Sequence, residues 1–196
     1  NIAITVAVAT GSFVLAIVAA VVITGFVGLI SERFLLRPIR GNEMLEVLVT
    51  VGLMFVLADV SLAVFGGNPR SLQVPSFLSG PFTIGPLVYP KYRLVLVALA
   101  VVIGVGLYLM QRYTRVGAII RAGVDDRETV GLIGINISKV FMWLFVFGAC
   151  LAALSGVAAA GILTMTPGAD TNILLYALVV VIVGGLGSIE GAAVGS

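Results

Sequence analysis

Eight of the twenty charged side chains of this chain lie in one polar stretch, residues 112–139. It reads RYTRVGAIIRAGVDDRETVGLIGINISK and holds five of the eleven basic residues and three of the nine acidic ones, between two long apolar runs. The chain has no histidine, and its single cysteine, Cys150, lies inside an apolar run. Catalytic triads and metal sites need such groups within mutual reach. We therefore expect no catalytic site, metal or cofactor, and the charges between the runs suggest a docking surface.

A glycine cluster near the C-terminal end invites comparison with a phosphate-binding loop. Such a loop places a lysine after its last glycine, but Ile189 and Glu190 stand in that region of this chain. We therefore expect this chain not to hydrolyse ATP itself. Either the glycines interrupt a membrane span so that free backbone groups line a cavity, or they allow close helix packing. The cluster is Gly184, Gly185, Leu186, Gly187 and Ser188.

Asp59 is a carboxylate within an apolar run that ends at Phe65. An ionised carboxylate costs roughly 2.5 to 3.5 kcal/mol at the centre of a membrane helix. Asp59 lies about 9 Å from the outer end of its run at 1.5 Å per residue, where hydration lowers that cost. It is either a polar contact near the mouth of a pathway or an interfacial acid paired with a loop group such as Arg70. We count Thr166 and Pro167, in a later connection, as further candidate pathway residues together with Gly184, Gly185, Gly187 and Ser188.

The hydropathy of the chain predicts which secondary-structure elements position these residues. Its composition is 60% hydrophobic and 10% charged, with a mean hydropathy of +1.21. Apolar runs long enough to cross a bilayer as helices predict an all-α, polytopic membrane protein. We expect one membrane domain over residues 1–196, with a broken helix or re-entrant segment near its end. The expected spans are residues 2–30, 45–65, 94–110, 140–163 and 173 to the end.

Two of these expectations concern the ends of the chain. The run from Ile2 to Ile30 would be about 43 Å long as one helix, which exceeds a hydrocarbon core of about 30 Å. It must tilt, protrude or break near Gly11. The chain opens without methionine and stops within a glycine-rich apolar segment. We therefore expect a fragment of a longer protein.

Orientation follows from the basic residues, which collect in cytoplasmic loops of membrane proteins. The connections 31–43 and 112–139 fall on one side and together carry eight basic residues, whereas residues 66–93 carry three on the other. The first side is therefore predicted to be cytoplasmic. Five prolines in residues 66–93 make a regular helix there improbable and predict an ordered external cap. In residues 112–139, apolar residues at helical spacing predict short amphipathic helices at the membrane face.

Small residues repeat along two of the predicted spans. Helices in membranes associate through such residues because they let backbones approach closely. The rows therefore predict close packing, either static or around a pathway. They are Ala16, Ala20, Thr24 and Gly28 in the first span, and Gly148, Ala152, Gly156 and Ala160 in the fourth, with Ala149, Ala153 and Gly161 beside them.

Several motifs resemble the permease subunits of branched-chain amino acid ABC importers, particularly the LivH type. The resemblance covers nearly the whole chain. The motif at residues 131–136, followed by a span rich in small residues, is shared with sugar permeases of the same superfamily, whereas the arginine-proline and terminal motifs point more narrowly to the LivH type. They are ERFLLRPIRG at residues 32–41, NPRS at 68–71, RAGVDDRE at 121–128, GLIGIN at 131–136 and VGGLGSIEG at 183–191.

The resemblance implies a multi-pass subunit of the bacterial inner membrane that acts in a larger assembly. Its implied partners are a second permease of the LivM type, two cytoplasmic ATP-binding subunits, a periplasmic amino-acid-binding protein and the lipid bilayer, with no nucleic acid. In that family the loop matching residues 117–136 is the ATPase-coupling segment. The implied coupling residues are Gly117, Arg121, Ala122, Asp125, Asp126, Arg127, Glu128, Gly134, Ile135 and Asn136.

The leading hypothesis is a permease subunit that forms the membrane pathway for branched-chain amino acids and is driven by separate ATPases. A ribose-type sugar permease or a urea or amide permease of the same superfamily would keep the coupling loop and change the cargo. An ion-coupled secondary transporter, with Asp59 as the coupling carboxylate, is the alternative from another class. A requirement of transport for ATP distinguishes the ABC permeases from the ion-coupled transporter. The ligand of the partner binding protein distinguishes the possible cargoes.

Overall fold

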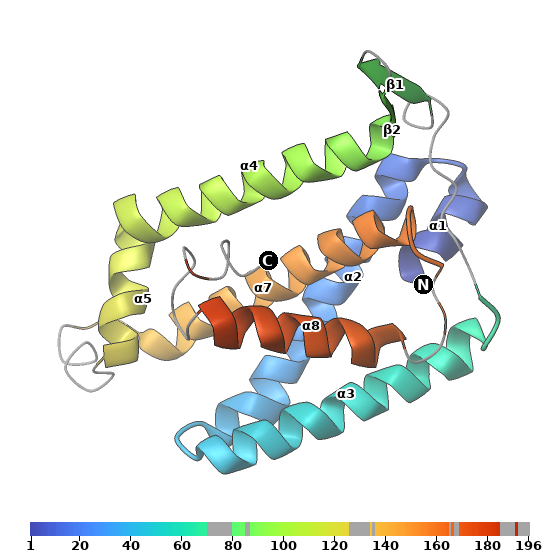
Figure 1. The fold of residues 1–196 in the computed structure, drawn as a ribbon. Coiled ribbons are helices and arrows are strands. Elements are labelled where there is room, and N and C mark those ends of the chain that lie inside the picture. The colour runs from blue at the N-terminus through green and yellow to red at the C-terminus, as the bar shows by residue number, and fades with distance from the viewer. Residues whose placement is uncertain are drawn as a thin grey trace. The chain divides into compact units, whose positions relative to one another are not determined.

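The chain folds almost entirely into helices, as its hydropathy predicts (Figure 1). The computed structural model describes residues 1–69, 80–84, 87–125, 134, 136–164, 166, 169–184 and 191. The end of α2 continues into a short π-helical segment, η1, and a 3₁₀ turn, η2. The helices are α1 (Ile2–Thr10), α2 (Phe13–Ser31), η1 (Glu32–Leu36), η2 (Arg37–Ile39), α3 (Glu43–Phe65), α4 (Lys91–Tyr113), α5 (Arg115–Asp125), α7 (Ile137–Ala160) and α8 (Ala169–Gly184).

Four helical segments of the described chain are long and apolar enough to cross a membrane: Phe13–Ile39, Met44–Phe65, Lys91–Tyr113 and Ile137–Ala160. The prediction of a multi-pass helical membrane protein is thereby confirmed. The fifth predicted span is represented by α8, which has 16 residues and is therefore about 24 Å long, less than the roughly 30 Å of a hydrocarbon core.

The first apolar run breaks at Gly11, one of the three outcomes that its length allowed. Gly11 has a φ of 65°, a left-handed conformation that glycine adopts without a steric penalty. Its backbone N–H donates to the carbonyl of Ala7 at 2.9 Å and ends α1. The hydroxyl of Ser12 then accepts from the backbone N–H of Leu15 and caps α2. Because α1 has nine residues, it reaches about 13 Å and cannot cross the bilayer alone.

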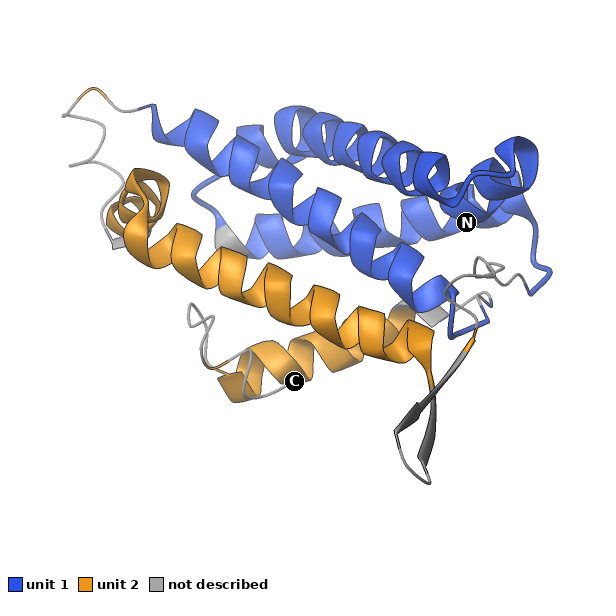
Figure 2. Cartoon of the chain, turned by 90° about the horizontal axis from the view of Figure 1, so that it is seen from above, with its two compact units in different colours: residues 1–73, 136–167 blue, residues 74–135, 168–196 orange. Residues whose placement is uncertain are grey.

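The chain divides into two compact units, which Figure 2 shows in blue and orange. Unit 1 comprises residues 1–73 and 136–167, and unit 2 comprises residues 74–135 and 168–196. One boundary between them falls at residues 135 and 136, inside the predicted coupling segment. The prediction of one membrane domain stays a prediction.

The core of unit 1 forms where α1, α2 and α7 pack together. Its buried residues are Ala3, Ile4, Ala16, Ala20, Val157 and Ala160. Ala16, Ala20 and Gly28 of the row predicted in the first span are all buried, so that row is confirmed as a packing face. Such small side chains bring the helix backbones close together, as expected for helices in a membrane.

Most of the row predicted on α7 does not face α2, although Ala160 belongs to the core. Gly148 and Gly156 are exposed, and a Cβ added at either would meet nothing within 4 Å. The neighbouring row faces α2 instead: a Cβ on Gly28 would lie 2.8 Å from the Cβ of Ala149, and one on Gly25 would lie 2.8 Å from Sγ of Cys150. Both rows consist of small residues, so their spacing alone could not predict which row packs against α2.

Unit 2 contains a β-hairpin that the sequence did not predict. Strands β1 (Pro81–Ile84) and β2 (Leu87–Pro90) are antiparallel, with Phe82 opposite Tyr89 and Thr83 opposite Val88. Pro81 and Pro90 form the terminal pair, where the missing N–H of proline is tolerated. The hairpin lies in the predicted external cap, of which residues 70–79, 85 and 86 lie outside the described chain. The hairpin leads directly into α4.

Candidate functional site

The first half of the predicted coupling segment begins at a tight junction between α4 and α5. The hydroxyl of Thr114 accepts from the backbone N–H of Gly117 at 3.3 Å and so caps the first turn of α5. Gly117 is buried, and a Cβ there would overlap the backbone carbonyl group of Gln111 in the last turn of α4. Only glycine therefore fits at residue 117 with this backbone.

Arg121 reinforces the same junction. Its Nη1 donates to the carbonyl oxygen of Gln111. No backbone N–H of α4 is available to this oxygen, because Gln111 lies in the last turn of the helix. A cation at a helix C-terminus also complements the helix dipole. Gly117 and Arg121, both predicted as coupling residues, thus hold α5 at a fixed angle to α4.

Helix α5 is the first of the amphipathic helices that the segment predicted. Val116 and Ala122 are exposed, Ile119 and Ile120 are half-buried, and Gly123 is buried. Asp125 ends the helix. The exposed side of α5 is therefore available to a partner or to the membrane face. The second predicted helix and Asp126, Arg127, Glu128 and Ile135 lie outside the described residues.

The second half of the segment ends on α7. Gly134 has a φ of 83°, which glycine allows at a sharp bend. Asn136 precedes α7, and its Oδ1 accepts from the backbone N–H of Lys139 at 3.2 Å. This cap satisfies one of the free donors at the helix start. The predicted coupling residue Asn136 thus fixes where the segment ends and the fourth span begins.

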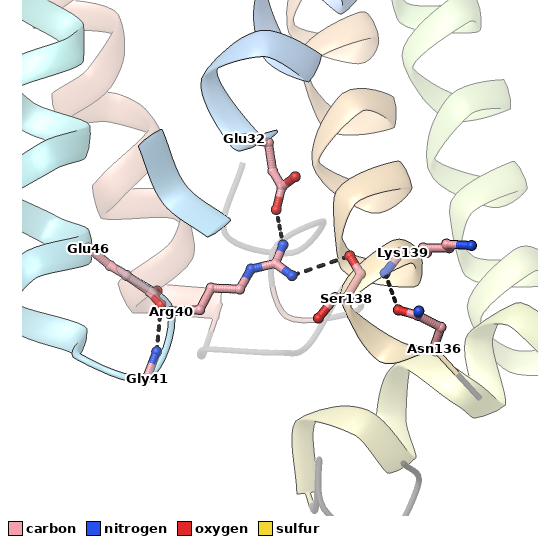
Figure 3. Close-up of polar contacts among 7 residues, drawn as sticks. All are labelled: Glu32, Arg40, Gly41, Glu46, Asn136, Ser138 and Lys139. Carbon is pink, nitrogen blue, oxygen red and sulfur yellow. Dashed lines mark hydrogen bonds and ion pairs between the residues drawn. The ribbon is translucent and has the colours of Figure 1, made fainter. Parts of the chain in front are cut away.

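A polar cluster beside this helix start was missed as a site by the sequence analysis (Figure 3). We call Glu32, Arg40, Ser138 and Phe141 the Arg40 clamp. Arg40 Nη2 pairs with Glu32 Oε1, while its Nη1 donates to the carbonyl oxygen of Ser138 at 3.2 Å. The guanidinium also lies 5.9 Å from the centre of the Phe141 ring, within cation–π range. The clamp therefore joins the end of α2 to the first turn of α7.

The same turn also reaches α3. The backbone N–H of Gly41 donates to Oε1 of Glu46 at 3.2 Å (Figure 3). The ends of α2, α3 and α7 are thus tied to the two residues Arg40 and Gly41. The sequence carries this signal as an acid at the end of a span, followed eight residues later by an arginine.

The predicted pathway residues fall in both units. Asp59 is exposed on α3, and Thr166 is exposed beyond α7, both in unit 1. Gly184 is the last residue of α8 in unit 2, and a Cβ on Gly191 would overlap its carbonyl group. Pro167, Gly185, Gly187, Ser188 and Arg70 lie outside the described residues. The assignment of these residues to one pathway, and the pairing of Asp59 with Arg70, stay predictions.

Comparison with known proteins gives one consistent result. A family described as "Branched-chain amino acid transport system / permease component" matches residues 2–196. The chain is 27% identical over 191 residues to the high-affinity branched-chain amino acid transport system permease protein BraD of Pseudomonas aeruginosa, covering 92% of this chain and 60% of the relative. It is 28% identical over 188 residues to the corresponding LivH protein of Escherichia coli K12, covering 91% and 59%.

A more distant relative is the probable branched-chain amino acid transport permease protein LivH of Methanocaldococcus jannaschii, 25% identical over 180 residues. The chain spans about three fifths of the length of the curated relatives it matches. No solved structure matches the chain.

Proposed function

The chain belongs to the branched-chain amino acid transport permease family, and from this premise we propose that it is a permease subunit of an ABC importer. It forms part of the membrane pathway for branched-chain amino acids and has no ATPase site of its own. Its energy comes from separate ATP-binding subunits. The names of the relatives BraD and LivH, which are high-affinity branched-chain amino acid transport permeases, support this cargo.

The proposed assembly has the partners implied by the resemblance. They are a second permease of the LivM type, two cytoplasmic ATP-binding subunits and a periplasmic amino-acid-binding protein, in the bacterial inner membrane. In this assembly the segment from residue 117 to residue 136 receives the push of the ATPases. The spans on either side then tilt and alternate access to the pathway.

The observation that carries this proposal is the rigid start of the coupling segment. Buried Gly117 and the bond from Arg121 to Gln111 hold α5 against the end of a membrane span, while Ala122 remains exposed. A helix that is fixed at one side and open at the other can pass a displacement to the span. A loosely attached loop would absorb it.

Crosslinking tests this docking directly. With Asp125→Cys in the assembled transporter, we expect a crosslink to an ATP-binding subunit, because Asp125 ends α5 on the predicted cytoplasmic side. Asn68→Cys, in the predicted external connection, is the matched control and should give none. The chain without either substitution reports any reaction of Cys150. An assembled complex in which Asp125→Cys forms no crosslink would sink the docking proposal.

A further inference from the structure

Arg40 divides its guanidinium between two acceptors in different parts of unit 1. Nη2 serves Glu32 at the end of α2, and Nη1 serves the Ser138 carbonyl in the first turn of α7. Ser138 lies two residues after Asn136, where the coupling segment ends. Any force that the segment applies to the start of α7 therefore reaches Arg40 within half a helical turn.

Glu32 is poorly satisfied in this arrangement. The residue is 1% exposed, and its Oε2 has no hydrogen-bond partner among the described residues. A buried carboxylate oxygen without a donor is costly, whereas a bidentate arginine–carboxylate pair is among the strongest polar contacts in proteins. Arg40 needs only to release the Ser138 carbonyl to direct Nη1 at Oε2. The structure shows the arrangement linked to α7, with Glu32 Oε2 left unpartnered among the described residues.

Close packing beside the clamp means that a movement of α7 is passed to α2 and is not absorbed locally. Gly28 and Gly25 lie so close to Ala149 and Cys150 that no Cβ fits between the helices without a shift. The Gly41 N–H holds the same turn to Glu46 of α3. A displacement of the first turn of α7 therefore also displaces the end of α2 and the start of α3.

We propose, building on the function proposed above, that Glu32 and Arg40 are positioning residues for transport. Arg40 links α7 to α2 in the arrangement described, and releases the Ser138 carbonyl to take both oxygens of Glu32 when the coupling segment moves. The pair thereby converts ATPase movement at residue 136 into movement of two spans. Neither residue touches the cargo.

The test measures ATP hydrolysis and amino acid uptake together, in proteoliposomes that hold the complete transporter. We expect Glu32→Gln and Arg40→Gln to keep assembly and hydrolysis, but to lower the uptake per ATP by at least about tenfold, within the range of coupling between linked sites. The double variant should be no worse than Arg40→Gln alone, because that variant already removes the contact that Glu32→Gln removes. Arg37→Gln, an exposed arginine in the same connection, should behave as wild type.

Arg40→Lys covers the case in which the glutamine variants fail to assemble. Lysine keeps the charge beside Glu32 but lacks the planar fork that serves two acceptors, so the uptake per ATP should still fall. Uptake and hydrolysis that decline in parallel, a ratio unchanged in every variant, or loss of assembly with Arg40→Lys as well would overturn the inference. A wild-type complex without ATP-driven uptake would instead overturn the proposed function, and this inference with it.

Discussion

Replacing Gly117 by alanine is expected to abolish coupled transport. The new Cβ would overlap the backbone carbonyl group of Gln111, and a backbone cannot move aside as the end of a side chain can. Alanine gains up to about 1 kcal/mol over glycine in helix propensity, but overpacking costs about 1 to 3 kcal/mol, and an overlap with a backbone group lies at the upper end of that range. The overlap therefore dominates, and α5 must swing away from the end of α4.

Co-purification of the ATP-binding subunit and ATP-driven uptake measure this effect. Gly106→Ala, on α4, is the matched control because a Cβ there meets nothing within 4 Å. It should leave both readouts at the wild-type level. If Gly117→Ala also assembles and transports normally, the α4–α5 junction described here does not position the coupling segment.

The second large effect is expected at the contact between α2 and α7. Gly28→Ala would place its Cβ 2.8 Å from that of Ala149, and neither atom can turn away because both are fixed to a helix backbone. We expect a loss of about 1 to 3 kcal/mol in the free energy of unfolding, measured by denaturant titration in detergent. Gly28→Leu should lose more.

The reciprocal change sharpens this prediction. Ala149→Gly removes the opposing Cβ, so the double variant Gly28→Ala with Ala149→Gly should recover most of the lost stability. Gly148→Ala and Gly156→Ala, whose added Cβ atoms meet nothing within 4 Å, should not destabilise the protein. Equal losses at Gly28 and Gly148 would contradict the packing of α2 on Ala149.

The sequence predicted those parts of the fold that depend on local properties. Hydropathy and length were enough to predict the helical spans. They also predicted that the first run must tilt, protrude or break near Gly11, because a single helix of that run is longer than the bilayer is thick. Apolar spacing predicted the amphipathic helix that begins at Arg115. The hairpin at residues 81–90 escaped prediction because the prolines that argue against a helix there also disfavour central strands.

The candidate site was predicted only in part, because its contacts join distant residues. The resemblance pointed to Gly117 and Arg121. Both residues are required there because they contact the carbonyl of Gln111, and that contact depends on the angle between α4 and α5. Arg40 meets Ser138, 98 residues along the chain, and no local pattern specifies that pairing. In the same way, a choice between two small-residue rows on α7 depends on how α2 approaches.

The central claim is that this chain belongs to an importer driven by ATP, and one measurement tests it most directly. The complete transporter is reconstituted in proteoliposomes with its binding protein, and accumulation of leucine, isoleucine and valine is followed with and without ATP while ionophores remove ion gradients. We expect accumulation that requires ATP and persists in the presence of ionophores. Accumulation that continues without ATP, and stops with ionophores or with Asp59→Asn, would contradict the account.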